Sequence, residues 1–240
     1  MPLSAQSAGR CLETALVSST QLSECIARAT GVPEATVLLH MRNVREAGIL
    51  TQGGRGRSAA RMTTRDAANL LIAVAGASAV KDSVVPIHRQ AQTWVREGTW
   101  EETLAVPELL ALPADHRFAD AVVALLNSAA SGSLEALAIE IQGSPVDLID
   151  DLRIPFWIKT TIAEPESTAF IEVIALDFNE DGELINEERR RVLYGGRKKL
   201  PGGNLEFDPP LDTELHGDLR HEHTFTHRTI QMIGNLLRGP

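Results

Sequence analysis

Apolar side chains recur at helical spacing in the first quarter of the chain. In residues 33–47 the apolar positions Val37, Met41 and Val44 are four and three residues apart, which places them on one face of a helix. Pro33 suits the first turn of that helix because its missing N–H has no partner there, and Gly48 suits its end. Residues 20–30 show the same spacing at Leu22 and Ile26 and end at Gly31. The pattern therefore predicts two helices joined by a short glycine turn.

The segment after these helices differs in composition. Ile49 and Leu50 favour a short strand, and the following "TQGGRGRSA" is rich in glycine and arginine and has no acidic residue. "ARMT" at 60–63 is read as the returning strand. Two helices, a short turn and a hairpin with an arginine-rich loop resemble the winged helix-turn-helix of bacterial and phage transcriptional regulators. The resemblance covers about residues 10–65.

The resemblance implies duplex DNA as the partner, with residues 33–47 in the major groove as the recognition helix and residues 51–62 as the wing. On the recognition helix, Thr36 and Asn43 could bond to bases, and Arg42 and Arg45 could reach phosphate or guanine. The wing would grip the backbone or minor groove. The complete expected DNA-binding set is Thr36, Leu39, His40, Arg42, Asn43, Arg45, Arg55, Arg57 and Arg61. Leu38 and Leu39 depart from the polar residues that this family often has, so they fit a protein contact as well as a thymine methyl.

The distribution of charge agrees with this division. Residues 1–65 contain eight arginines and four acidic residues, which gives a net charge of +4. The remaining residues have a net charge of -13, and the whole chain has a net charge of -9. A polyanion would attract the first part and repel the second. The longest apolar run, at 70–80, is too short to span a bilayer, so we expect no membrane partner and a cytoplasmic protein.

The rest of the chain predicts helices first and strands later. Thr63 and Asp66 form a capping-box pattern before the apolar residues 67–80, and further helices are expected over 83–96 and 115–129. From 134 onwards, "LEALAIEI", "FWIKTTIA" and "TAFIEVIAL" are typical of strands, and the tail predicts a closing helix with Ile230 and Ile233 on one side. The expected fold is α+β. It divides into a winged helix-turn-helix over 1–65, a helical linker or dimerisation region over 66–132, and a mixed α+β domain with antiparallel strands over 133–240.

Two clusters raise the question of metal binding. "DFNEDGELINEE" places Asp177, Asn179, Asp181 and Glu188 at positions of the calcium-loop template, although the preceding residues favour a strand and a hairpin turn explains the segment better. Four histidines lie near the C-terminus without a completing ligand pattern. The basic run at 188–199 is expected to pair with neighbouring acids, and the alternative is that it adds phosphate contacts beside the N-terminal module. We therefore expect no metal, no cofactor and no enzymatic activity.

The sequence favours a sequence-specific transcriptional regulator that binds double-stranded DNA as a homodimer. The C-terminal part could carry a site for an effector or a protein partner, which the sequence does not identify. One alternative keeps DNA binding but assigns the chain to phage or plasmid replication, packaging or partition. A second alternative is a protein-interaction module whose helix-turn-helix does not bind DNA.

Overall fold

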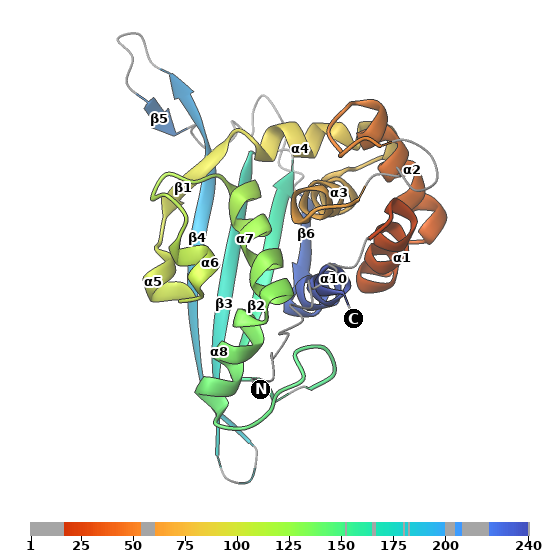
Figure 1. Cartoon of the computed structure of the whole chain (residues 1–240). Helices are drawn as coiled ribbons and strands as arrows, with labels where there is room; N and C mark the ends of the chain where they lie inside the picture. The colour runs from red at the N-terminus through yellow and green to blue at the C-terminus, as the bar shows by residue number, and fades with distance from the viewer. Residues whose placement is uncertain are drawn as a thin grey trace, which may run out of the picture.

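The chain folds into an antiparallel β-sheet with helices packed against it, and a pair of N-terminal helices lies at the side of the molecule opposite strand β1 (Figure 1). The computed structural model describes residues 17–53, 61–151, 153–164, 167–179, 181, 183–199, 205–207 and 221–239. The α+β class expected from the sequence is confirmed.

The strands are β1 (Thr93–Glu97), β2 (Phe156–Glu164), β3 (Thr168–Phe178), β4 (Leu184–Lys199), β5 (Leu205–Phe207) and β6 (His221–Thr226). They lie in the order β1-β4-β3-β2-β6, with β5 paired to β4, and each of these pairings is antiparallel. Alternate residues of β2 are buried because successive side chains of a strand point to opposite faces; Ile158 and Ile162 thus face the helices.

The helices are α1 (Ser19–Thr30), α2 (Glu34–Glu46), α3 (Thr64–Gly76), the 3-10 turn η2 (Val80–Asp82), α4 (Val84–Gln90), α5 (Trp100–Thr103), α6 (Pro107–Leu110), α7 (Phe118–Ser131), α8 (Ser133–Gln142) and α10 (His227–Arg238). Capping explains several of the boundaries. Thr63 and Asp66 form the expected capping box at the start of α3. Gly132 ends α7 in the left-handed region, which favours glycine.

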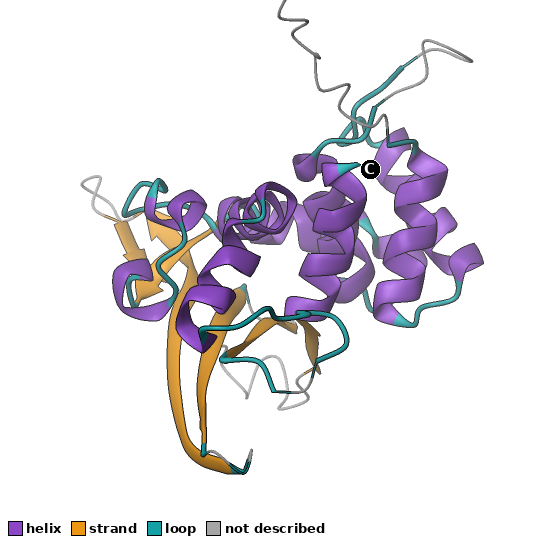
Figure 2. Cartoon of the chain, turned by 60° about the horizontal axis from the view of Figure 1, so that its bottom comes forward, coloured by secondary structure: helices purple, strands orange, loops and turns teal. Residues whose placement is uncertain are grey.

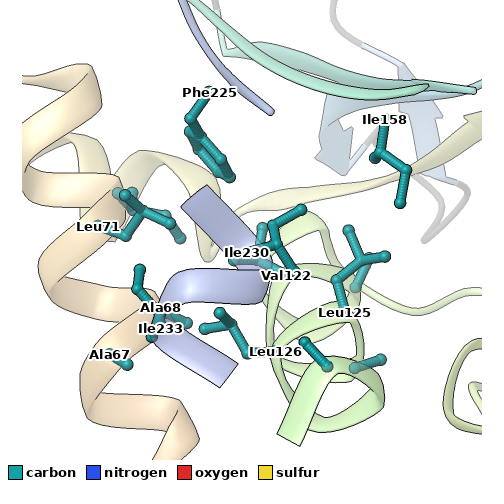
Figure 3. Close-up of a cluster of buried hydrophobic side chains, with 14 of the residues drawn as sticks. Ala67, Ala68, Leu71, Val122, Leu125, Leu126, Ile158, Phe225, Ile230 and Ile233 are labelled. Carbon is teal, nitrogen blue, oxygen red and sulfur yellow. The ribbon is translucent and has the colours of Figure 1, made fainter. Parts of the chain in front are cut away.

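One cluster of buried side chains contains residues from all three parts into which the sequence was divided, including Val37, Leu71 and Ile230. Figure 3 shows Leu71, Val122, Phe225 and Ile230 meeting between the helices and the sheet. At the crossing of α7 and α10, a Cβ at Gly234 would collide with Ala129, so glycine permits the close approach of the two helices. The N-terminal helices therefore share a core with the body.

The structure corrects two elements expected after residue 80. Residues 83–96 were expected to be helical, but α4 ends at Gln90 and Thr93–Glu97 forms β1 against β4. The segment "LEALAIEI" was expected to be a strand, but it forms α8. Its leucine, alanine and glutamate residues are good helix formers, and Gly143 closes the helix in the left-handed region, so these preferences outweigh the two isoleucines.

Within the described ranges, no single helix is both long and apolar enough to cross a membrane; only α7 and α8 taken together meet the length and composition, and they are bent by 73°.

Candidate nucleic-acid interface

The helix pair α1–α2 forms as the sequence predicts. Ser18 caps α1 and forms a reciprocal capping box with Gln21. Gly31 follows α1 with a φ of 73°, a left-handed conformation that few other residues adopt without strain, and this lets the chain turn directly into α2. Val37, Met41 and Val44 are buried on the inner side of α2, so the expected apolar stripe is confirmed.

The opposite side of α2 is open to solvent and carries two arginines and two leucines. Leu38 is 41% exposed and Leu39 is 50% exposed, values that are high for large apolar side chains. Arg42 and Arg45 are also exposed. The Arg42 Nε lies 2.7 Å from a carboxylate oxygen of Glu46, one turn later. An exposed pair of this kind contributes little to stability, so Arg42 can exchange it for another anion at small cost.

A third side of α2 packs against η2 and uses two of the expected DNA contacts. His40 is only 4% exposed, and its Nδ1 lies 2.9 Å from the Ser83 hydroxyl. Asn43 donates from Nδ2 to the Val80 carbonyl at 2.7 Å and to the Ser83 hydroxyl at 3.3 Å. Burial lowers the pKa of His40. His40 and Asn43 thus hold α2 in place in this structure and do not lie on its open face.

Thr36 is half-buried in the first turn of α2, where its backbone N–H donates to the Pro33 carbonyl at 2.9 Å. Of the expected contacts on this helix, Leu39, Arg42 and Arg45 share the open face, and Thr36 lies at its margin.

The segment after α2 does not form the expected strands within residues 49–53 and 61–63. Leu50 is buried, and Thr51 donates its backbone N–H and its hydroxyl to the Asp66 carboxylate at 2.7 and 2.8 Å. The Thr63 N–H donates to the same carboxylate at 2.8 Å, and the Met62 N–H donates to the Val17 carbonyl. Asp66 thus satisfies donors that a strand ladder would otherwise use.

The three expected arginine contacts in this segment have different outcomes. Arg61 is exposed. Arg55 and Arg57 lie outside the described residues. Because Thr51 and Thr63 bond to one carboxylate, the two flanks of the arginine-rich segment meet at the N-terminus of α3.

The second basic run lies on β4, and two of its arginines, Arg189 and Arg190, form the expected pairs with acids. The Arg189 Nε lies 2.5 Å from a carboxylate oxygen of Glu187, and its Nη1 lies 3.6 Å from Glu172 on β3. Arg190 lies 2.8 Å from Glu188 and also donates to the Glu102 carbonyl. β4 also contains Arg191, Arg197, Lys198 and Lys199, so these pairs balance only part of its positive charge.

The calcium-loop template falls on a β-hairpin. Asp177 is in β3 and accepts a hydrogen bond from Asn186 at 3.0 Å, whereas Glu188 lies in β4 opposite Ala175. The Asn179 side chain accepts from the Glu183 N–H at 2.8 Å. Cross-strand pairing therefore separates residues that a calcium loop would wrap around one ion. No group of three or more potential metal ligands occurs among the residues that the structure describes.

A buried polar cluster was not indicated by the sequence. The Trp100 Nε1 donates to His116 Nε2 at 3.0 Å, and the Tyr194 hydroxyl lies 2.9 Å from the same nitrogen. His116 Nδ1 lies 2.7 Å from the Pro113 carbonyl, which fits a neutral ring that donates from Nδ1 and accepts at Nε2. Burial lowers the pKa of His116 and raises that of Tyr194. Both ring nitrogens are occupied, so the cluster has the features of a structural network.

Sequence reasoning missed the contacts of Ser83 and part of the role of Asp66. The capping-box spacing of Thr63 and Asp66 indicated that Asp66 caps α3, but it did not indicate that Asp66 also binds Thr51. Ser83 meets α2 only through tertiary packing across about forty residues, and no local pattern marks such a contact.

The chain matches no protein-family model, no curated protein and no solved structure.

Proposed function

We propose that this protein is a cytoplasmic transcriptional regulator that binds specific double-stranded DNA sequences as a homodimer, with α2 in the major groove. The observation that carries the proposal is the open face of α2, which presents Leu39, Arg42 and Arg45 on a helix that follows a tight glycine turn.

The dimensions of α2 suit this role. Its 13 residues span about 20 Å at 1.5 Å per residue, and a helix of this kind fits the roughly 12 Å width of the major groove. Arginine can bind guanine or phosphate through two parallel hydrogen bonds, and a leucine can contact the methyl group of thymine. The open face therefore offers both charge and apolar surface to the groove.

The attachment of α2 to the body supports specific recognition. Val37, Met41 and Val44 fix one side of the helix, while Asn43 and His40 fix another against η2. A helix held on two sides presents its remaining side chains in a defined orientation. Preorganised contacts of this kind lower the entropic cost of binding.

Charge favours the same orientation. The first 65 residues carry a net charge of +4 and the remainder -13, so a DNA duplex would be drawn to the N-terminal helices and repelled by the body. Arg55, Arg57 and Arg61 would add backbone contacts, a part of the proposal that rests on the sequence and on the resemblance to winged helix-turn-helix regulators.

The proposal predicts the effect of a double substitution, Arg42→Ala with Arg45→Ala. If both arginines contact phosphate, the slope of log affinity against log salt concentration becomes shallower by about 1.8, because each contact contributes about 0.9. Affinity at physiological salt is expected to fall about 10- to 100-fold. Fluorescence anisotropy on labelled duplex DNA over a range of salt concentrations measures both quantities.

The matched control is Arg189→Ala with Arg190→Ala, which removes the same charge from β4, at the other side of the molecule (Figure 1). This control is expected to keep the salt slope of the unaltered protein. Equal loss of affinity in the two double variants would contradict the assignment to α2 and would indicate a nonspecific effect of charge.

The exposure of Leu38 and Leu39 favours a second candidate function, a protein-interaction module in which α2 binds an apolar partner surface. Binding through such a surface would be nearly insensitive to salt, and duplex DNA would not compete with the partner. A further alternative, a factor for phage or plasmid replication, packaging or partition, also binds DNA. A promoter-reporter assay separates it from a regulator, because only a regulator changes transcription from its binding site.

A further inference from the structure

The hairpin of β3 and β4 extends beyond the helices. Figure 1 shows both strands continuing past α8, and Figure 2 shows the hairpin curving away from the helical layer. Every residue of β4 from Leu184 to Arg191 is exposed. Near its tip, Leu184 is 50% exposed and Ile185 is 65% exposed. Leu184 and Ile185 are consecutive, so their exposed side chains form an apolar patch at the end of a projecting hairpin, and apolar patches of this kind mark interaction surfaces.

A β-bulge sets the position of Ile185. Asp177 pairs with Asn186 and Phe178 pairs with Leu184, so Ile185 is the extra residue of the bulge. Bulges bend a strand and redirect the side chain of the extra residue. Leu184 lies directly opposite Phe178, and residues in that relation project from the same face of a hairpin.

An open groove begins at the same place. It has a volume of about 390 Å³ and lies between the end of α8 and the end of β3. Its apolar lining comes from Ile141, Pro155, Leu176 and Phe178. Because Phe178 lines the groove and pairs with Leu184, the projecting tip and the groove are adjacent parts of one surface.

The groove is lined by one acidic and one basic residue, Asp177 and Arg153, and both are exposed. Asp177 already accepts a hydrogen bond from Asn186, whereas the Arg153 side chain forms no ion pair with any residue that the structure describes. The tip carries exposed Asp181 and Glu183. A tip inserted into another copy of the groove would bring these acids towards an arginine, which favours this chain as the occupant over an unrelated apolar segment.

We propose that this surface binds a second copy of the chain, with the Leu184 and Ile185 tip of each copy in the groove of the other. An apolar projection beside an apolar groove is self-complementary across a two-fold axis, because the contact made by one copy is repeated by its partner. The dimer deepens the proposed function, since the homodimer expected at a two-fold symmetric DNA site needs an interface. It is tested without DNA, so either proposal can fail while the other stands.

Sedimentation equilibrium on the full chain tests the interface. The unaltered protein is expected to be a dimer, and Ile185→Glu is expected to raise the dissociation constant at least about 100-fold, because each dimer contains the change twice. Val85→Glu is the matched control: Val85 is 47% exposed on α4, away from the hairpin, so this variant remains dimeric. A protein that is monomeric at every concentration, or an Ile185→Glu variant as dimeric as Val85→Glu, would overturn the proposal.

A charge-reversal cycle tests the orientation of the two copies. Arg153→Glu alone, and Asp181→Lys with Glu183→Lys alone, are each expected to weaken the dimer. All three changes together are expected to restore it, because the same pairs form with exchanged signs. Weakening that is simply additive in the triple variant would refute tip-in-groove pairing and would indicate that the tip meets another partner.

Discussion

His227 shows how burial at a single residue links stability to pH. It is the first residue of α10 and is 6% exposed, and its Nδ1 accepts a hydrogen bond from the Ile158 N–H at 3.4 Å. Burial, together with the neighbouring charge of Arg228, lowers its pKa to about 4. The folded protein therefore holds this imidazole neutral at pH values where an unfolded chain would protonate it, since the ordinary pKa is about 6.5.

This pKa predicts a specific loss of stability in acid. Above about pH 6.5 the ring is neutral in both states and contributes no pH dependence. As the pH falls from about 6.5 to about 4, the unfolded state takes up the proton first, so the free energy of unfolding falls by up to about 3 kcal/mol from this group. His227→Gln is expected to lose that share of the acid sensitivity. Urea unfolding of both proteins at pH 7, 6 and 5 measures the difference.

The buried residues His40 and His116 also have lowered pKa values, and both proteins in this comparison contain them, so their contribution cancels. Parallel curves of stability against pH for the two proteins would show that His227 is not the group responsible.

At the scale of elements, local signals predicted much of the structure that carries the candidate site. The spacing of Val37, Met41 and Val44 identified α2 and its inner side, and Gly31 located the turn before it. Strands β2 and β3 followed from their β-branched residues. These elements could be predicted because the residues that determine them are neighbours in the sequence.

Elements that depend on distant partners were not predicted. β1 is a strand because β4 pairs with it about a hundred residues later, and the sequence around Thr93 contains no sign of that partner. The wing strands were wrong for a more local reason: Asp66 accepts the backbone N–H groups of Thr51 and Thr63, and the sequence indicated only the second of these contacts. The open face of α2 was predicted only in part, because the contacts of His40 and Asn43 with η2 depend on tertiary packing.

The contact of Asn43 with η2 predicts a structural effect of its substitution. Asn43→Ala removes the bonds to Val80 and Ser83, so the free energy of unfolding is expected to fall by about 1–2 kcal/mol. Chemical denaturation measures the change. Asn186→Ala is the matched control, because its bond to Asp177 is exposed and its loss should cost less than about 0.5 kcal/mol. Unchanged stability in Asn43→Ala together with weaker DNA binding would return Asn43 to the set of direct DNA contacts.

At the scale of the whole molecule, the N-terminal helices are part of the body. The Cys25 thiol lies 3.5 Å from the Met232 carbonyl, and the Thr229 hydroxyl donates to the Ala29 carbonyl at 3.3 Å, so α1 is held against α10. Together with the contacts of α2 with η2, this arrangement places the open face of α2 in a fixed position on the acidic body. A dimer of such units would hold its two α2 helices at one separation, and that separation would set the spacing of the DNA half-sites.

Selection of bound sequences from a random library of duplex DNA, carried out with the full chain, tests the central claim most directly. The account predicts enrichment of an inverted repeat whose half-sites are about one helical turn, or a multiple of it, apart, and loss of that enrichment in the Arg42→Ala, Arg45→Ala protein. Recovery of the library unchanged by the unaltered protein, or the same enriched sequence with both arginines removed, would contradict DNA reading by α2.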